Sequence, residues 1–223
     1  MLRALLIRHH REDNPGLIGD AFRSRGFQVD VAMMDEESST PSLEGVEVLV
    51  ILGSKSAVYD PLVEEAWFGR ELSLMRDAAA KQIPMLGICF GAQALCRFHG
   101  GVVEASRVPE VGWYDVEPIG DSPIESGPWF EFHFDHCILP EVATPWARTN
   151  NAVQAFVVGR DVGVQFHPEV DEAQLRDWFE AGDEVPRELG SREDLLARTA
   201  KETPHARIRA ASLVDIFIRH ASV

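Results

Sequence analysis

The segment IPMLGICFGAQALCRF, residues 83–98, constrains the fold more than any other part of the chain. Its apolar start predicts the end of a buried strand, and the run 92–98 predicts a helix. Between these two elements, Cys89 is flanked at minus two and plus two by Gly87 and Gly91. A strand that turns sharply into a helix at a nucleophile needs such small residues, because the backbone passes close to its neighbours there. The segment therefore predicts a strand–turn–helix unit with Cys89 at the turn.

The predicted turn gives Cys89 two features that a nucleophile needs. The helix dipole favours the thiolate form of a cysteine at the helix N-terminus, and the thiolate is the form that attacks. The first backbone N–H groups of that helix have no intrahelical acceptor, so they can bind an oxyanion. The alternative is that Cys89 is a small buried hydrophobic residue, which is a common role for a free cysteine.

A second segment, VQFHPEV at residues 164–170, favours the catalytic interpretation. A cysteine nucleophile needs a base, and the base needs a carboxylate that orients it. His167 and Glu169 lie two residues apart, and Pro168 fixes the backbone between them. The triplet alone is a weak signal, but with the strand–turn–helix unit it completes a predicted Cys89-His167-Glu169 triad.

The order of the remaining segments predicts an α/β fold. Strand, helix, strand and strand patterns follow each other at short spacing from the N-terminus, which is typical of a parallel sheet with helices outside. We expect an open, mostly parallel sheet flanked by helices, a flavodoxin-like three-layer sandwich with an antiparallel extension. The predicted strands are 2–8, 27–33, 46–52, pieces of 102–119 broken by Pro109 and Gly112, 129–134, 146–150, 153–158 and 162–166. The predicted helices are 17–25, 62–82, 92–98, 171–181, 191–201 and 206–220, with a loop over 35–45.

Composition excludes several classes of partner. Lys and Arg total 21 against 36 Asp and Glu, which gives a formal net charge of −15. Nucleic acids and anionic membranes need clustered cations, so we expect neither as a partner. No apolar run approaches the length of a membrane-spanning helix, and the N-terminus lacks a signal-peptide pattern. Three cysteines without regular spacing argue against a disulfide framework, so we expect a cytoplasmic protein.

The two motifs GICFGAQ (87–93) and QFHPEV (165–170) resemble those of the class I glutamine amidotransferase family. Weaker similarities support this resemblance, which runs from about residue 40 to 170. The segment 52–60 is similar to the family's Gly-Gly-Pro loop, 110–113 to its Glu-Ile-Gly-Trp segment, and 132–135 to its Trp-His-Gly-Asp segment. Among members of the family, the chain is similar to the glutamine amidotransferase domain of GMP synthetase.

The resemblance implies further site residues. The backbone N–H groups of Ser54 and Phe90 would form the oxyanion hole. The substrate glutamine would contact Gly53, Gln93, Phe132, His133 and Asp135. Ser54 and Lys55 stand where the family usually has a second glycine and a proline, and Ser54 keeps its backbone donor in place only if its φ stays negative. Without the motif, Gln93 would be interpreted as a solvated helix residue.

We expect neither a metal nor a cofactor. His133, His136 and Cys137 lie close together in the sequence, but structural zinc sites usually draw four ligands from two paired clusters. The sequence shows no second cluster. It also lacks a nucleotide-binding loop of the Gly-x4-Gly-Lys type.

The resemblance implies hydrolysis of the L-glutamine side-chain amide through a γ-glutamyl thioester, giving glutamate and ammonia. The ammonia would serve a separate acceptor synthetase, and residues 1–223 would form one domain with a helical segment from about 171. One alternative is an independent hydrolase of γ-glutamyl amides or peptides with the same triad. Another is a non-catalytic regulatory module that kept the fold.

Overall fold

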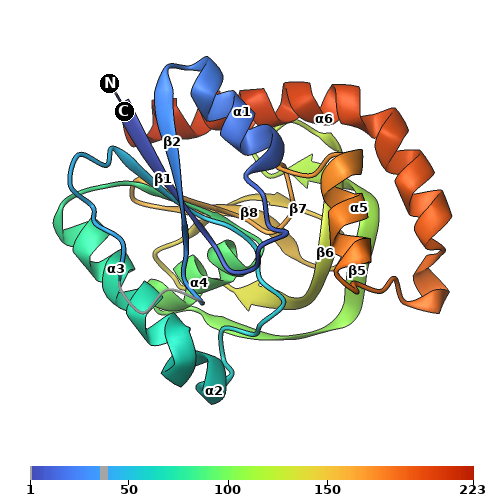
Figure 1. Ribbon diagram of the computed structural model, residues 1–223, viewed down its shortest axis with the longest axis horizontal. Coiled ribbons are helices and arrows are strands. Elements are labelled where there is room, and N and C mark those ends of the chain that lie inside the picture. The colour runs from blue at the N-terminus through green and yellow to red at the C-terminus, as the bar shows by residue number, and fades with distance from the viewer. Residues whose placement is uncertain (1, 36–39) are drawn as a thin grey trace.

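The computed structural model describes residues 2–35 and 40–223. Within them, nine strands form one sheet in the order β2-β1-β3-β4-β9-β8-β7-β5-β6 (Figure 1). The strands are β1 (Leu2–Arg8), β2 (Phe27–Met33), β3 (Val48–Ile51), β4 (Met85–Ile88), β5 (Val102–Pro118), β6 (Gly127–Ile138), β7 (Thr144–Arg148), β8 (Val153–Val158) and β9 (Asp161–Val164). Of the loop expected over 35–45, residues 36–39 lie outside the described part of the chain.

One half of the sheet is parallel and the other is antiparallel. Strands β2, β1, β3, β4 and β9 pair in parallel. Strands β9, β8, β7, β5 and β6 then pair antiparallel, each with the next. The expected α/β fold with a parallel sheet and an antiparallel extension is confirmed. The extension is long because β5 and β6 form an extended two-stranded ribbon.

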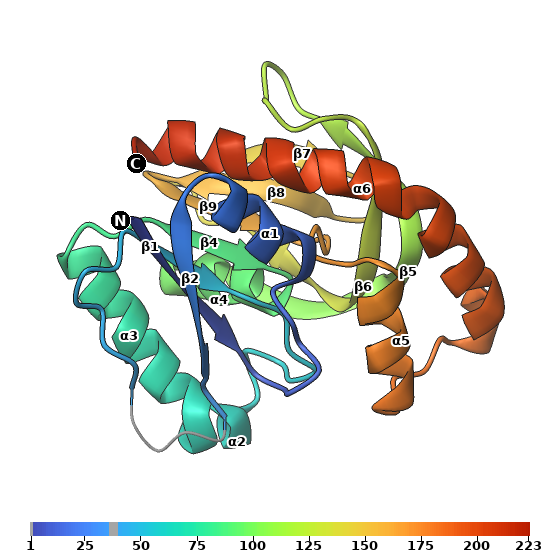
Figure 2. The same cartoon turned by 45° about the horizontal axis from the view of Figure 1, so that its top comes forward.

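Helices cover both faces of the parallel half. The helices of the described residues are α1 (Gly16–Ser24), α2 (Pro61–Val63), the π-helical turn η1 (Glu64–Phe68), α3 (Gly69–Ala80), α4 (Phe90–Phe98), α5 (Glu172–Glu180), the 3₁₀ turn η2 (Arg187–Leu189) and α6 (Arg192–Ala221). Figures 1 and 2 show α1 and α6 over one face and α3 and α4 over the other. None of the helices in the described residues combines the length and the apolar character that crossing a membrane requires.

The alternation of β1 side chains separates two cores. Ala4 and Leu6 pack in the core beneath α1 and α6, whereas Leu5 and Ile7 pack in the core beneath α3 and α4. All four side chains are at most 2% exposed. A strand that is buried on both faces has a continuous apolar sequence, which is why this segment lacks polar alternation. The three-layer arrangement follows from that continuous run.

Some expected elements are joined or divided differently in the structure. The residues 191–201 and 206–220 form one continuous helix, α6, which includes Pro204. The pieces expected in 102–119 form the single strand β5, whose register with β6 shifts between Ala105 and Glu110. Pro109 lies in that irregular stretch, where its missing N–H costs no ladder hydrogen bond. The helix expected over 62–82 begins with α2 and η1 before α3.

Candidate active site

Cys89 lies at the turn between β4 and α4 in a backbone conformation that is rare for a residue with a side chain. Its φ is 52° and its ψ is −106°, whereas an ordinary residue pays strain energy at positive φ. The flanking glycines make the turn possible. A Cβ on Gly87 would overlap the carbonyl of Gly91, and a Cβ on Gly91 would overlap the carbonyl of Ile51. The glycine bracket is therefore a requirement of backbone packing, as the sequence predicts.

Strand pairing brings the two motifs together. The parallel pairing of β4 with β9 sets Ile88 beside Val164, so the residues that follow each strand meet at one edge of the sheet. The Cys89 N–H donates a hydrogen bond of 2.8 Å to the Val164 carbonyl. Three residues beyond Val164, the His167 N–H donates to the Phe130 carbonyl of β6 at 2.7 Å. The position of His167 is thus fixed by both halves of the sheet.

His167 and Glu169 form a buried pair. The distance between His167 Nδ1 and Glu169 Oε1 is 2.7 Å, and the two residues are 5% and 3% exposed. Burial lowers the pKa of His167, but the charges of Cys89 and Glu169 outweigh it and hold this pKa well above the ordinary 6.5. His167 Nε2 has no hydrogen-bond partner within the described residues. The imidazole therefore has a free nitrogen and a raised proton affinity beside the cysteine.

The backbone at the two expected oxyanion donors is suitable for that role. Phe90 is the first residue of α4, so its N–H has no intrahelical acceptor. Among the described non-glycine residues, only Gln82, Cys89 and Ser222 have positive φ, so Ser54 keeps the negative φ that its donor requires. Gly53 precedes it, and a Cβ there would come within 3.1 Å of His167 Cε1.

A cavity of about 240 Å³ opens at this edge of the sheet. Every predicted site residue except Phe90 lines the cavity. These lining residues are Gly53, Ser54, Cys89, Gln93, Phe132, His133, Asp135, His167 and Glu169. The structure therefore brings together residues from four segments that are well separated in the sequence.

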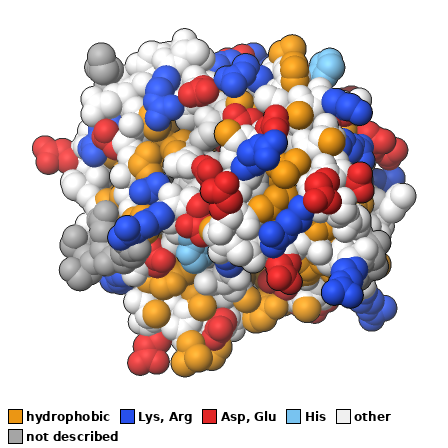
Figure 3. Space-filling view, turned by 45° about the vertical axis from the view of Figure 1, so that its right-hand side comes forward, with side chains coloured by type: hydrophobic (Ala, Val, Ile, Leu, Met, Phe, Trp, Pro, Cys, Tyr) orange, Lys and Arg blue, Asp and Glu red, His pale blue; other side chains and the backbone are white. Residues whose placement is uncertain are grey.

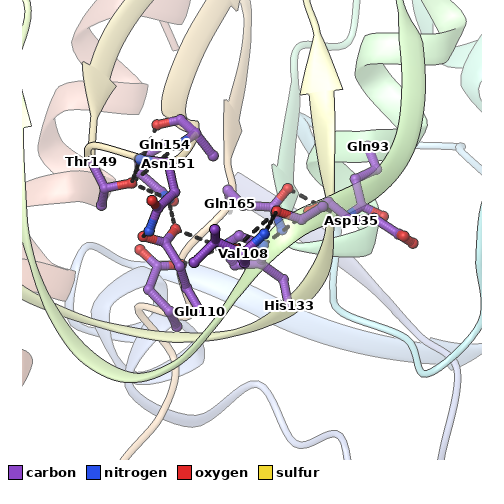
Figure 4. Close-up of polar contacts among 12 residues, drawn as sticks. Gln93, Val108, Glu110, His133, Asp135, Thr149, Asn151, Gln154 and Gln165 are labelled. Carbon is purple, nitrogen blue, oxygen red and sulfur yellow. Dashed lines mark hydrogen bonds and ion pairs between the residues drawn. The ribbon is translucent and has the colours of Figure 1, made fainter. Parts of the chain in front are cut away.

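Gln93 and Asp135 have specific partners at the cavity, and Figure 4 shows the Gln93–Gln165 pair. Gln93 is 4% exposed and its Nε2 donates to Gln165 Oε1 at 3.2 Å, so the interpretation as a solvated helix residue is wrong. Asp135 Oδ1 accepts a hydrogen bond of 2.9 Å from the Tyr59 hydroxyl. This bond ties the loop after β3 to strand β6 beside the cavity.

Several lining residues were not predicted from the sequence. Trp178 of α5 lies with its ring centroid 5.1 Å from that of His167. Lys55 pairs with Glu12 and Asp183 at 3.2 Å each, which joins three loops at the cavity. Asp13 is 9% exposed, and burial raises the pKa of its carboxyl to about 7. The position of Asp13 in the sequence could have identified it as a site residue. It follows the first strand, and ligands bind beyond the carboxyl ends of parallel strands.

A buried charged cluster surrounds His133, which also lines the cavity (Figure 4). His133 Nε2 lies 3.1 Å from Glu110 Oε2 and 3.4 Å from Glu131 Oε2. Its Nδ1 donates to the Asp135 carbonyl at 2.9 Å, and Gln154 donates to Glu110 at 2.6 Å. Burial lowers the pKa of His133, but Glu110 and Glu131 raise it to about 10. The charged imidazole of His133 is therefore paired with the Glu110 carboxylate, while burial raises the pKa of the second carboxyl, Glu131, to about 7.

The same cluster is the one group in the described residues whose ligand atoms are close enough for a metal ion. Glu110, Glu131 and His133 each offer one atom, and these atoms lie within 4.8 Å of one another. His136 is close to His133 in the sequence but does not belong to this group. Its Nε2 lies 3.6 Å from Glu104 Oε1. Since both nitrogens of His133 already carry protons in hydrogen bonds, a metal ion would have to displace one of them.

Comparisons with known proteins agree with the two motifs. The family model described as glutamine amidotransferase class-I matches residues 14–177. The GMP synthase [glutamine-hydrolyzing] of Helicobacter acinonychis is 30% identical over 166 residues, which cover 71% of this chain and 31% of that protein. The corresponding enzyme of Thermosipho melanesiensis is 31% identical over 168 residues, with the same coverage. The chain thus spans about a third of the length of these curated relatives.

Solved structures match the whole chain. A glutamine amidotransferase from Thermotoga maritima has a TM-score of 0.87 and 29% identity, and the match covers 100% of this chain and 99% of that one. A glutamine amidotransferase from Methylobacillus flagellatus, at 23% identity and a TM-score of 0.86, shares the fold over 99% of this chain and 96% of that one. Taken with the family match over residues 14–177, these findings show that the chain belongs to the class I glutamine amidotransferase family.

Proposed function

We propose that the chain hydrolyses the side-chain amide of L-glutamine with Cys89 as the nucleophile, His167 as the base and Glu169 as the orienting carboxylate. One observation carries the proposal: the β4–β9 pairing sets the strained Cys89 beside the buried His167–Glu169 pair at the edge of the cavity. Covalent acyl transfer needs a nucleophile next to a base that is itself held by an orienting group, and these three residues have that arrangement.

The proposed reaction has two halves. His167 takes the thiol proton, Cys89 Sγ bonds to the amide carbon, and the C–N bond breaks while His167 returns the proton to the leaving ammonia. Water then attacks the γ-glutamyl thioester with His167 as base, which gives glutamate and restores the thiol. The N–H groups of Ser54 and Phe90 would stabilise the oxyanion in both halves, and one such donor typically lowers the barrier by about 3 kcal/mol.

Gly53, Gln93, Phe132, His133 and Asp135 are the proposed substrate contacts, because all five line the cavity. The ammonia would pass to a separate acceptor enzyme. The similarity to GMP synthases supports this part of the proposal. On the face shown in Figure 3, Lys and Arg side chains are interspersed with Asp and Glu, which gives no reason to add nucleic acid as a partner. Residues 1–223 would act as one domain, in the cytoplasm.

The experiment combines intact-mass measurement with an ammonia assay. The protein is incubated with a chloroketone analogue of glutamine, and ammonia release from glutamine is measured in parallel. We expect one adduct and slow ammonia release in the wild type, and neither in Cys89→Ser. Cys96→Ser is the matched control, because Cys96 is also buried on α4 but does not line the cavity.

The possible results separate the alternatives. An adduct on Cys89 without turnover of glutamine would replace the proposal with a hydrolase of other γ-glutamyl compounds. Absence of any adduct would indicate a non-catalytic module. Unchanged ammonia release in Cys89→Ser would show that the nucleophile is another residue.

A further inference from the structure

His9 is a buried histidine that the proposed reaction does not use. It follows β1 directly, and its side chain is 0% exposed. Its Nδ1 lies 2.8 Å from the Gly53 carbonyl oxygen, and its Nε2 lies 2.8 Å from Glu71 Oε2 of α3. Glu71 is also 0% exposed. A chain of two hydrogen bonds therefore runs from a buried carboxylate to the loop that follows β3.

The partners of His9 determine where its protons lie. A carbonyl oxygen only accepts hydrogen bonds, so Nδ1 carries a proton and donates it to Gly53. A carboxylate also only accepts, so Nε2 donates to Glu71. Burial opposes the charge of the imidazole, but Glu71 and the Gly53 carbonyl outweigh it and raise the pKa of His9 above 6.5. His9 is thus a buried imidazolium whose two donors are both engaged.

The His9 ring also contacts the other side of the proposed oxyanion hole. Its centroid lies 4.9 Å from that of Phe90 and 4.7 Å from that of Trp67. Trp67 and Glu71 are four residues apart, so they lie on neighbouring turns of one helical segment. One imidazole therefore touches both sides of the proposed oxyanion hole: it is hydrogen-bonded to Gly53, the residue before the donor Ser54, and its ring contacts Phe90, which carries the other donor.

The Gly53 carbonyl and the Ser54 N–H belong to the same peptide unit, which is planar. A donor fixed on the oxygen therefore sets the direction of the N–H, and it also polarises the unit so that the N–H becomes a stronger donor. Gly53 needs such an anchor, because glycine leaves its backbone free to rotate. A side chain there could not replace it, since a Cβ would come within 3.1 Å of His167 Cε1.

We propose that His9, held by Glu71, is a positioning residue that aims and polarises the Gly53–Ser54 peptide toward the oxyanion of the reaction. The inference rests on the proposed function, because the oxyanion forms only if Cys89 attacks a carbonyl. His9 itself touches no substrate in this account. It acts on the transition state through the Ser54 N–H.

The test compares two variants that differ only in the donor. Glu71→Gln keeps the shape, and a neutral His9 still donates from Nδ1 to Gly53 while its Nε2 accepts from the new amide. His9→Phe combined with Glu71→Gln keeps an aromatic ring beside Trp67 and Phe90 but removes the donor, without leaving an unpaired buried carboxylate. We expect kcat for glutamine hydrolysis to be about 10²-fold lower in the double variant than in Glu71→Gln, with KM within about threefold.

Alkylation of Cys89 by iodoacetamide distinguishes positioning from general damage. Displacement of iodide at a carbon atom develops no oxyanion, so this rate should stay within about twofold between the two variants while kcat falls. An equal kcat in both variants would show that His9 only fills the core. A raised KM at constant kcat would assign it to substrate binding instead. A parallel loss of alkylation and kcat would show that the Cys89 turn had been disturbed. Each of these three results overturns the inference.

A spectroscopic measurement keeps the inference separate from the proposed function. The amide nitrogen resonance of Ser54 is sensitive to a hydrogen bond on the preceding carbonyl, so it should move between Glu71→Gln and the double variant. If the wild type releases no ammonia, the proposed function fails, and the Ser54 resonance still reports whether His9 holds the peptide. An unmoved resonance would overturn the inference even in an active enzyme.

Discussion

At the scale of single residues, the proposed chemistry depends on the charge of His167. Glu169 is one of the groups that raise its pKa, and the 2.7 Å contact to Nδ1 also fixes the tautomer. Glu169→Gln should therefore lower kcat for glutamine hydrolysis by roughly 10²-fold or more, since the imidazolium loses its partner. The measurement is steady-state ammonia release. Glu172→Gln, which changes a half-buried carboxylate of α5 that does not line the cavity, is the matched control and should be unchanged.

A second prediction at this scale concerns pH. The folded-state pKa of Asp13 is raised by burial from 3.8 to about 7, so the folded protein holds a proton there that the unfolded chain releases. The contribution of Asp13 to the free energy of unfolding is fully present below about pH 4 and is lost as the pH rises toward 7. Asp13→Asn should thus be about 1–3 kcal/mol more stable than the wild type at pH 8, with a smaller difference at pH 5. Urea unfolding at both pH values measures it, and an equal difference at both would contradict the raised pKa.

The residues that sequence motifs can predict are those whose partners lie nearby in the chain or in a second motif. Cys89, His167 and Glu169 were predicted in this way, and the structure places them together. His9 and Glu71 were not, because the partners of His9 lie 44 and 62 residues away. A buried ion pair leaves no periodic pattern in either segment. Only the fold reveals that these side chains meet.

At the scale of elements, α6 contains a proline in its interior. Pro204 has no N–H for the carbonyl four residues before it, and a proline inside a helix costs about 3 kcal/mol relative to alanine. Pro204→Ala should raise the free energy of unfolding by roughly 1–3 kcal/mol. Denaturant unfolding measures the change, with Pro186→Ala outside the helices as the matched control.

A loss of stability in Pro204→Ala would contradict this expectation. It would mean that the helical turn interrupted by Pro204 is needed to position Thr199. The Thr199 hydroxyl accepts a 2.9 Å hydrogen bond from Trp113 Nε1 of β5. Thr203 also donates to the Thr199 carbonyl at 2.8 Å in the same turn. Comparison of the Trp113→Phe change in both backgrounds would then show whether the two sites are coupled.

Local sequence propensity was sufficient to predict the parallel strands, but it was insufficient to predict that β5 and α6 are each continuous. A proline reads as a boundary in a single sequence. In β5 the bulge between Ala105 and Glu110 accommodates Pro109, and in α6 packing against α1 and α5 continues the helix past Pro204. Tertiary contacts therefore override the local signal at both places, and a sequence alone does not contain those contacts.

At the scale of the whole molecule, α6 closes the core on the face of α1. Ala210, Leu213, Val214 and Phe217 are at most 1% exposed and belong to the same core as Ala4 and Leu6 of β1. Arg25 adds a hydrogen bond of 2.7 Å to the Ala211 carbonyl and an ion pair of 2.6 Å to Asp215. The first strand and the last helix are thus parts of one core, although the family model ends at residue 177.

This shared core predicts that residues 1–190 alone do not fold. Burial of a leucine, valine or phenylalanine side chain contributes about 1.5–3 kcal/mol, so the loss of Leu213, Val214 and Phe217 alone removes roughly 5–9 kcal/mol. That is comparable to the whole stability of a typical domain, about 5–15 kcal/mol. A chain that ends at residue 190 should therefore aggregate or lack a cooperative thermal transition, whereas the 223-residue chain should unfold in one step.

A matched pair of substitutions measures the same effect without truncation. Phe217→Ala should cost about 3–5 kcal/mol, because Phe217 is 0% exposed. Ile208→Ala on the same helix should change stability by less than about 0.5 kcal/mol, because Ile208 is 64% exposed. If instead the chain ending at 190 melted cooperatively and Cys89 still took up the chloroketone, α6 would be an attachment to a smaller domain. The absence of α6 from the matched family segment would then mark a true domain boundary.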